Sequence, residues 1–212
     1  VFVTLVAFVL SSLTGCRLFS SRVTLETLTT AAEIERGGDQ LYKSGHYDTA
    51  ADRFEEAAAM VPTDQLVRRK LADTYWAENR YHAAIAMMRT AIDLAHPAID
   101  RELRQEWFVR LAEMNLDIGN VDRALHWVDR AIEENPQMLS ARIVRGSIFA
   151  RVQSYNAALE DYHYALSLMA EESSAERVRV EIEVARIYSH QRRPHRVLAM
   201  TSAIDPRTLQ PT

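Results

Sequence analysis

The sequence has 212 residues, of which 48% are hydrophobic and 25% charged, and its formal net charge is −4 at pH 7. A chain of this length and composition can bury a substantial core and is typical of folded rather than disordered proteins. The mild acidity gives no support for binding to nucleic acid or to an anionic membrane surface. Six glycines and six prolines are few for this length, which favours helices over turn-rich β architectures. The single cysteine excludes an internal disulfide and a cysteine-cluster metal site.

The first ten residues, VFVTLVAFVL, are apolar except for Thr4. The run is shorter than the about 20 residues that a membrane-spanning helix needs, but it fits the hydrophobic region of a secretory signal, which has roughly 7–15 residues. No Lys or Arg precedes it, and the stretch SSLTGC follows it, ending at Cys16. The sequence therefore predicts a signal segment over residues 1–15. The alternative is that Cys16 is buried in an ordinary N-terminal helix.

The four residues LTGC, at positions 13–16, resemble the lipobox of bacterial lipoproteins, in which Leu, a small residue and Gly precede the modified cysteine. The resemblance implies that the signal is cleaved before Cys16 and that the Cys16 thiol carries a lipid anchor. In enterobacterial lipoproteins an Asp after the cysteine favours the inner membrane. Arg17 stands there instead, which implies an outer-membrane protein facing the periplasm.

Residues 17–30 contain six Ser or Thr and show no helical stripe. We therefore expect residues 16–30 to form a lipidated cysteine followed by a flexible tether. At about 3.3–3.6 Å per residue, this tether could reach at most roughly 50 Å from the lipid.

From Ala31 onward, small residues recur in phase. The three series are Ala50, Ala84, Ala124 and Ala158, then Ala57, Ala91, Ala131 and Ala165, and finally Gly38, Ala72, Ala112 and Gly146. All three series have the same steps, and the first and last steps are equal, while the middle one is slightly longer. This pattern resembles the tetratricopeptide (TPR) repeat of about 34 residues, a helical hairpin that buries its apolar face by stacking on its neighbours.

The resemblance implies an all-α, right-handed TPR solenoid with about four and a half to five repeats. We expect repeats at 31–64, 65–98, 105–138 and 139–172, and a degenerate fifth repeat at 178–206, where Val197 replaces an alanine. Extra residues near 99–104 and 171–177 should lengthen the connections or the helices that follow them.

In TPR proteins, positions 2, 5, 9, 12 and 13 of each repeat tend to face a concave groove. The resemblance therefore implies a partner-binding groove formed by Glu35, Asp39, Tyr42, Arg69, Asp73, Trp76, Glu113, Asp117, Arg151, Arg179 and Arg186. This groove should be acidic and aromatic at its start, apolar in its middle around Val109 and Leu116, and basic at its end. The Lys and Asn residues of carboxylate-clamp TPR proteins are absent from positions 5 and 9 of the first two repeats.

Two pairs of like charges stand four positions apart, Glu35–Asp39 and Glu113–Asp117. Each pair costs a few tenths of a kcal/mol on an isolated helix. Either basic residues of a partner neutralise the carboxylates, or neighbouring Arg69 and Lys43 do so. Trp76 has two interpretations as well, since it could anchor a bound peptide or simply pack against the next repeat.

No P-loop, dinucleotide-binding motif or nucleophile-elbow motif occurs in the sequence. His190 and His195 flank a short stretch that includes Arg192 and Arg193, which disfavours a metal there. Arginine accounts for nearly all of the 25 basic residues and suits phosphate binding, but the net acidity and the predicted export argue against nucleic acid. We therefore expect no enzyme activity, cofactor, metal or small-molecule substrate.

Together these features predict a membrane-anchored TPR lipoprotein that acts as a protein–protein interaction scaffold or adaptor in the bacterial envelope. TPR lipoproteins of this kind serve in pilus or secretion assembly, in outer-membrane protein assembly, or as adaptors for hydrolases. The alternative is a structural subunit of a larger envelope assembly, held by end-on or lateral contacts, because the irregular fifth repeat lacks the polar cap that a solenoid end needs.

Overall fold

The structure, a computed structural model, describes residues 24–169 and 175–201, and these contain ten α-helices and no strand. The predicted signal segment and Cys16 lie outside the described residues. The helices are α2 (Leu25–Lys43), α3 (Tyr47–Met60), α4 (Gln65–Ala77), α5 (Tyr81–Leu94), α6 (Arg101–Asp117), α7 (Val121–Glu134), α8 (Leu139–Arg151), α9 (Tyr155–Leu168), α10 (Ala175–His190) and α11 (Pro194–Thr201).

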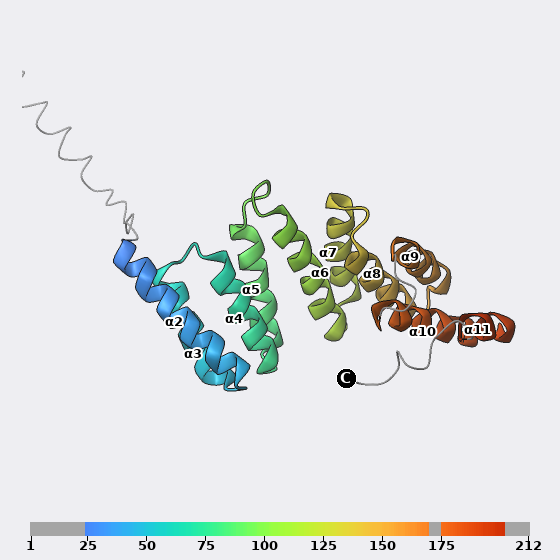
Figure 1. Cartoon of the computed structure of the whole chain (residues 1–212), viewed down its shortest axis with the longest axis horizontal. Helices are drawn as coiled ribbons and strands as arrows, with labels where there is room; N and C mark the ends of the chain where they lie inside the picture. The colour runs from blue at the N-terminus through green and yellow to red at the C-terminus, as the bar shows by residue number, and fades with distance from the viewer. Residues whose placement is uncertain (1–23, 170–174, 202–212) are drawn as a thin grey trace, which may run out of the picture.

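Consecutive helices pack as hairpins, α2 with α3 through to α10 with α11, and each hairpin contacts the next along the chain. The hairpins follow one another along the long axis of the molecule, so that α2 and α11 lie towards opposite ends (Figure 1). The predicted all-α TPR solenoid is confirmed. Among the described helices, none combines the length and the apolar character needed to cross a membrane.

The small residues that recur in the sequence are the points of closest packing. All eight alanines of the two main series, from Ala50 to Ala165, are fully buried. At Gly38, an added β-carbon would lie 2.7 Å from the buried ring of Phe54, and at Gly146 it would lie 2.8 Å from the ring of Tyr162. The two pairs occupy the same positions of their repeats, so an aromatic ring at this position of the second helix needs a glycine in the first helix.

In the second and third repeats an alanine takes the place of this glycine. There the position of the aromatic ring is taken by Met88 or Val128, both fully buried and neither aromatic. The volumes of the two positions therefore compensate each other along the solenoid, as dense packing of a core requires.

The turn inside each hairpin has one residue with positive φ. These residues are Gly45, Asn79, Gly119, Gln153 and Arg192, with φ between 55° and 82°. In the first hairpin the amide of Gly45 donates to the carbonyl of Tyr42, and the amide of His46 donates to that of Leu41. This pattern, a Schellman motif, satisfies the last carbonyl groups of the first helix. The same two bonds recur in the other four hairpins.

Arginines at the start of the following hairpin bind the end of the preceding one. Nη1 of Arg104 donates to the carbonyl of Ala95 over 3.2 Å, and Nη1 of Arg177 donates to that of Leu166 over 3.1 Å. Arg68 and Arg142 reach carbonyls near the ends of α3 and α7 in the same way. A cation is favourable beside the C-terminal end of a helix. Part of the arginine content is thus structural.

Residues 25–30, which the sequence analysis assigned to the tether, form the first turns of α2, so that prediction was wrong for them. The hydroxyl of Thr24 accepts a hydrogen bond from the amide of Thr27, which caps the helix. Thr29 and Thr30 donate their hydroxyl protons to the carbonyl of Glu26 inside the helix. The threonines are therefore compatible with a helix.

The extra residues before the third repeat lengthen a helix, as the sequence suggested they could. Helix α6 has 17 residues, whereas the first helices of the second and fourth repeats, α4 and α8, have 13 each. The fifth hairpin consists of the 16-residue α10 and the 8-residue α11.

Candidate functional site

Four of the predicted groove residues meet in one small pocket between α2 and α4. Its volume is about 130 Å³. The lining residues are Asp39, Tyr42, Phe54, Arg69, Lys70 and Asp73. Phe54 is almost completely buried and closes the floor, while the charged side chains form the rim. The first helices of the first two repeats thus present carboxylates, cations and a tyrosine around an apolar floor.

Lys70 neutralises the first pair of like charges. Its Nζ lies 2.7 Å from Oε1 of Glu35 and 2.7 Å from Oδ2 of Asp39. Partial burial lowers the pKa of Lys70, but the hydrogen bonds to Asp39 and Glu35 outweigh it, and the net shift is upward. Arg69 and Lys43 were the residues expected in this role, whereas Lys70, one position after Arg69, was not predicted.

Arg110 has the corresponding place in the third repeat, since both Lys70 and Arg110 are at position 6 of their repeats. Its Nε lies 3.5 Å from Oδ1 of Asp73, and its Nη1 donates to Oε2 of Glu113 over 3.4 Å. The guanidinium also lies over the ring of Trp76, 5.7 Å from its centroid. A cation at position 6 of one repeat therefore binds a carboxylate at position 9 of the repeat before it. Asp117, by contrast, is exposed at the end of α6 and makes no ion pair among the described residues.

Trp76 packs within its own hairpin. Its ring lies 4.7 Å from the ring of Tyr81 and contacts the hydrophobic core from a partly buried position. Packing against Tyr81 and the core, with the guanidinium of Arg110 from the next repeat over its ring, thus accounts for Trp76.

The expected apolar middle of the groove was wrong for Val109, because its side chain is buried in the core. Leu116 is also largely buried, but it lines a pocket between α8 and α10. Exposed apolar surface lies instead at Leu66 and Leu103, which are 47% and 37% exposed. These leucines line a pocket of about 200 Å³ together with Arg69, Glu106, Trp107 and Arg110. Sequence reasoning could have found this pocket, because Leu66 and Glu106 are both at position 2 of their repeats.

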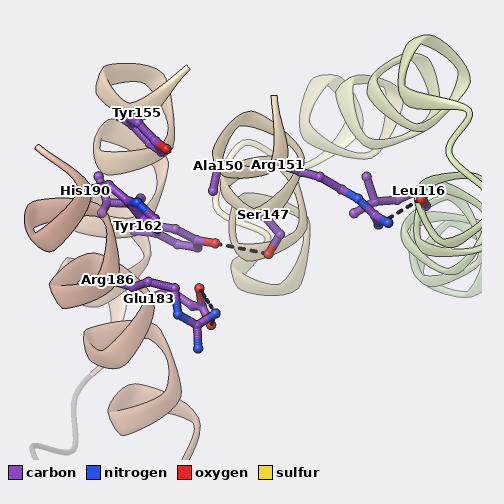
Figure 2. Close-up of a pocket in the computed structure, with 10 residues that line it drawn as sticks. Leu116, Ser147, Ala150, Arg151, Tyr155, Tyr162, Glu183, Arg186 and His190 are labelled. Atoms are coloured by element: carbon purple, nitrogen blue, oxygen red, sulfur yellow. Dashed lines mark hydrogen bonds and ion pairs between the residues drawn. The ribbon is translucent and has the colours of Figure 1, made fainter. Parts of the chain in front are cut away.

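A larger open pocket of about 350 Å³ lies between α8 and α10, and Tyr155 and Tyr162 of α9 also line it (Figure 2). Its polar wall includes Ser147, Arg151, Glu183, Arg186 and His190. The rings of Tyr155 and His190 stack with their centroids 5.8 Å apart. Two of the predicted basic groove residues, Arg151 and Arg186, therefore belong to one pocket.

Arg179, the remaining predicted basic residue, is exposed on α10 and lines none of these three pockets. Glu183 was not among the predicted residues, although it pairs with Arg186 over 3.0 Å. The predicted positions thus converge at two places, the α2/α4 pocket and the α8/α10 pocket. Within the described part of the chain, no group of three His, Cys, Asp or Glu side chains is arranged to hold a metal ion.

Comparison with known proteins agrees with this geometry. The tetratricopeptide repeat family model matches residues 41–105. No curated protein matches the sequence.

Several solved structures share the fold at low sequence identity. MamA superposes with a TM-score of 0.68 and 19% identity over 85% of this chain and 91% of its own. YrrB, described as a TPR protein with an unusual peptide-binding site, gives 0.60 and 15% over 80% of this chain and 82% of its own. PilF of Pseudomonas aeruginosa gives 0.64 and 13% over 80% of this chain and 72% of its own.

The fold and the matching repeats identify a TPR solenoid, the class of protein that the recurring small residues predicted. TPR solenoids are generally non-enzymatic scaffolds for protein–protein interactions, and a TPR structure with a peptide-binding site is among those similar to this one. Protein segments are accordingly the class of ligand that this fold suggests.

Proposed function

We propose that the protein is a lipid-anchored adaptor of the bacterial cell envelope, which holds an extended or helical segment of a partner protein against its first helices. The observation that carries the binding part is the convergence of the groove positions. Asp39, Tyr42, Arg69 and Asp73, all chosen by their position in the repeat, line one pocket between α2 and α4.

The pockets provide the chemistry that a peptide needs. The α2/α4 pocket has an apolar floor at Phe54 and a charged rim, and the neighbouring pocket exposes Leu66 and Leu103. Aromatic and apolar anchors with charged groups around them are typical of peptide-binding surfaces. Pockets of about 130 and 200 Å³ suit single side chains rather than a small-molecule substrate.

The membrane anchor is proposed from the apolar run at residues 1–10 and the sequence LTGC at residues 13–16, with Cys16 as the lipidated residue. Fatty-acid labelling of cells that produce the wild type or a Cys16→Ser variant tests it. We expect label on the wild type only, together with release of the variant from membranes. Equal labelling of both proteins would refute lipidation at Cys16.

The binding face is tested by comparing two double variants that each remove two carboxylates. Asp39→Asn/Asp73→Asn alters the first helices, whereas Asp52→Asn/Asp93→Asn alters exposed positions on the second helices α3 and α5. We expect the first variant to lose partners captured from envelope extracts and the second to keep them. Loss by both, or by the second alone, would place the binding surface elsewhere.

The structural-subunit alternative predicts a different result. Sedimentation of the purified protein would then give concentration-dependent polymers, whereas an adaptor with an open groove sediments as a species of constant size.

A further inference from the structure

The two most exposed large apolar side chains among the described residues both stand at the start of a first helix. Ile99, just before α6, is 81% exposed, and Leu25, at the start of α2, is 78% exposed. Leu28, three positions after Leu25 and thus on the same helix face, is 45% exposed. Single apolar side chains are common on protein surfaces, so the position that these three share is what calls for an explanation.

The first helices run in parallel, so their starts share one edge of the solenoid. Leu66 of α4 and Leu103 of α6 line the same pocket. Seven positions further along both helices, Oδ1 of Asp73 lies 3.5 Å from Nε of Arg110. Early residues thus meet early residues and later ones meet later ones. The start of α2 and the connection from α5 to α6 accordingly lie on the same side of the molecule, opposite the α2–α3 turn (Figure 1).

Helix α2 extends beyond the start of its neighbour α4. Nζ of Lys70 lies 2.7 Å from Oε1 of Glu35. Because Lys70 is the sixth residue of α4 and Glu35 the eleventh of α2, α2 begins about five residues earlier. At 1.5 Å per residue, its first turns extend roughly 7–8 Å past the start of α4. Leu25 and Leu28 belong to this extension.

The loop that presents Ile99 is held by hydrogen bonds. Nδ1 of His96 accepts from the amides of Ala98 and Ile99, each over 3.3 Å. The amide of His96 donates to Oδ2 of Asp100 over 2.8 Å, and the amide of Asp100 donates to the carbonyl of His96 over 2.8 Å. Ile99 is therefore held outside the core by an ordered loop rather than by a lack of local structure.

The charges along this edge balance. Residues 24–28, 62–69 and 96–104, which include the starts of α2, α4 and α6, contain four carboxylates and four arginines. An edge without net charge neither repels nor selects for anionic lipid headgroups. Its apolar side chains would therefore decide whether it binds a lipid surface.

The proposed anchor point is close to the same edge. Eight peptide units separate Cys16 from Thr24, the residue that caps α2. At about 3.3–3.6 Å per residue they reach at most roughly 26–29 Å. A lipid at Cys16 would thus keep the start of α2 near the bilayer, where a small apolar contact is enough to orient the solenoid.

We infer that the edge where the first helices begin lies against the lipid bilayer, with Leu25, Leu28 and Ile99 inserted at the membrane surface. This inference rests on the proposed function, since it requires the anchor at Cys16. It turns the hairpin turns away from the membrane. The groove residues Asp39 and Asp73 lie further along the first helices, so the groove stays open to a partner.

The test uses residues 16–212, the chain that the proposed cleavage leaves, with methyl-labelled Ile, Leu and Val. The only thiol, that of Cys16, is coupled to a maleimide phospholipid in phosphatidylcholine nanodiscs that also contain a gadolinium-chelate lipid. NMR then measures the paramagnetic relaxation enhancement of each methyl group. The readout is Ile99, because the tether alone keeps Leu25 and Leu28 near the lipid.

Val152 is the matched control, since it is 43% exposed but follows the last residue of the first helix α8, at the opposite edge. We expect a much larger enhancement at Ile99 than at Val152. Equal enhancements would show that the anchored protein has no preferred orientation and would overturn the inference. So would an enhancement at Ile99 that appears only when anionic lipid is added, because the contact would then be electrostatic.

Two substitutions of similar exposure locate the contact. Leu28→Gln should lower the enhancement at Ile99 about 3- to 10-fold, because it removes an apolar contact at the other end of the edge. Val152→Gln should leave the enhancement unchanged. Equal effects of the two substitutions, or no effect of Leu28→Gln, would contradict insertion of the α2 extension.

The two proposals can fail separately, because chemical coupling replaces the natural lipid. If fatty-acid labelling shows lipid on Cys16 in cells but the coupled protein has no preferred orientation, the edge inference is wrong and the anchor stands. If cells attach no lipid to Cys16, the anchor is refuted, while the coupled protein still measures the contact itself.

Discussion

A β-carbon added to Gly38 would lie 2.7 Å from Cε1 of Phe54, closer than β-carbons approach other atoms in proteins. Because Phe54 is fully packed, the ring could move away only by displacing its neighbours. The first helix and the second helix of this repeat are therefore fitted to each other at one atom.

This contact makes Gly38→Ala destabilising although alanine is the better helix former. Overpacking should cost about 1–3 kcal/mol, against a gain in helix propensity of about 1 kcal/mol. The control is the adjacent Gly37→Ala, where nothing lies within 4 Å of the added β-carbon and only the gain remains. Urea denaturation should show opposite shifts in the unfolding midpoint. Stabilisation by both substitutions would contradict the close packing.

The positive φ at Gln153 predicts a stabilising substitution. Gln153 has φ of 62° in the turn of the fourth hairpin, at the place that Gly119 occupies in the third. A left-handed backbone conformation costs a non-glycine residue about 1–2 kcal/mol. Glycine avoids this cost in the folded protein, but part of the gain is offset because glycine increases the conformational entropy of the unfolded chain. On these magnitudes Gln153→Gly should raise the free energy of unfolding by about 0.5–1 kcal/mol, and Gly119→Gln should lower it by about 1 kcal/mol. Thermal denaturation checks both, and a stabilising Gly119→Gln would contradict this interpretation of the turn.

Lys70 should contribute to stability through its contacts with two carboxylates of the preceding repeat. Lys70→Met leaves Glu35 and Asp39 facing each other without this cation, which should cost roughly 1–2 kcal/mol at this half-buried site. Adding Glu35→Gln and Asp39→Asn to this variant should recover most of the loss. Arg53→Met, which breaks an exposed pair, should change little. A Lys70→Met variant as stable as the wild type would show that the ion pairs contribute nothing.

His163 predicts a loss of stability in mild acid. Its Nε2 lies 3.0 Å from the hydroxyl of Tyr188, to which Nη1 of Arg196 also donates over 3.3 Å. Partial burial, and then the charge of Arg196, lower the pKa of His163 in the folded protein. In the unfolded chain, His163 has the ordinary histidine pKa of about 6.5. As the pH falls below that value, the unfolded chain therefore binds a proton at His163 more readily than the folded protein does.

The contribution of neutral His163 is thus complete above about pH 6.5 and decreases below it. Urea denaturation of the wild type and of His163→Gln at pH 8 and pH 5.5 measures the effect. The wild type should lose more stability between the two pH values than the variant does. An equal loss in both proteins would assign the pH dependence to other groups.

The fold could be predicted from the sequence because its main determinants are local and periodic. Ala50, Ala84, Ala124 and Ala158 are small at a near-constant interval, as close helix packing requires. Part of the site was predictable for the same reason, since Asp39 and Asp73 follow from their position in the repeat.

The remaining features depend on contacts between repeats. Lys70 and Arg110 reach carboxylates of the preceding repeat, which the spacing within one repeat does not reveal. Val109 occupies a groove position but is buried in the core. The start of α2 was not predicted because a segment rich in Ser and Thr is typical of a flexible tether. In the structure, Thr29 and Thr30 instead donate their hydroxyl protons to a helix carbonyl.

The central claim, that the first helices hold a segment of a partner protein, is tested most directly by site-specific photo-cross-linking in living cells. A photoreactive residue would replace Tyr42 or His190 on the first helices, or exposed Asp52 or Glu160 on the second helices. The account predicts cross-linked products of one partner at Tyr42 and His190 and none at Asp52 and Glu160. Products only at Asp52 or Glu160 would contradict it.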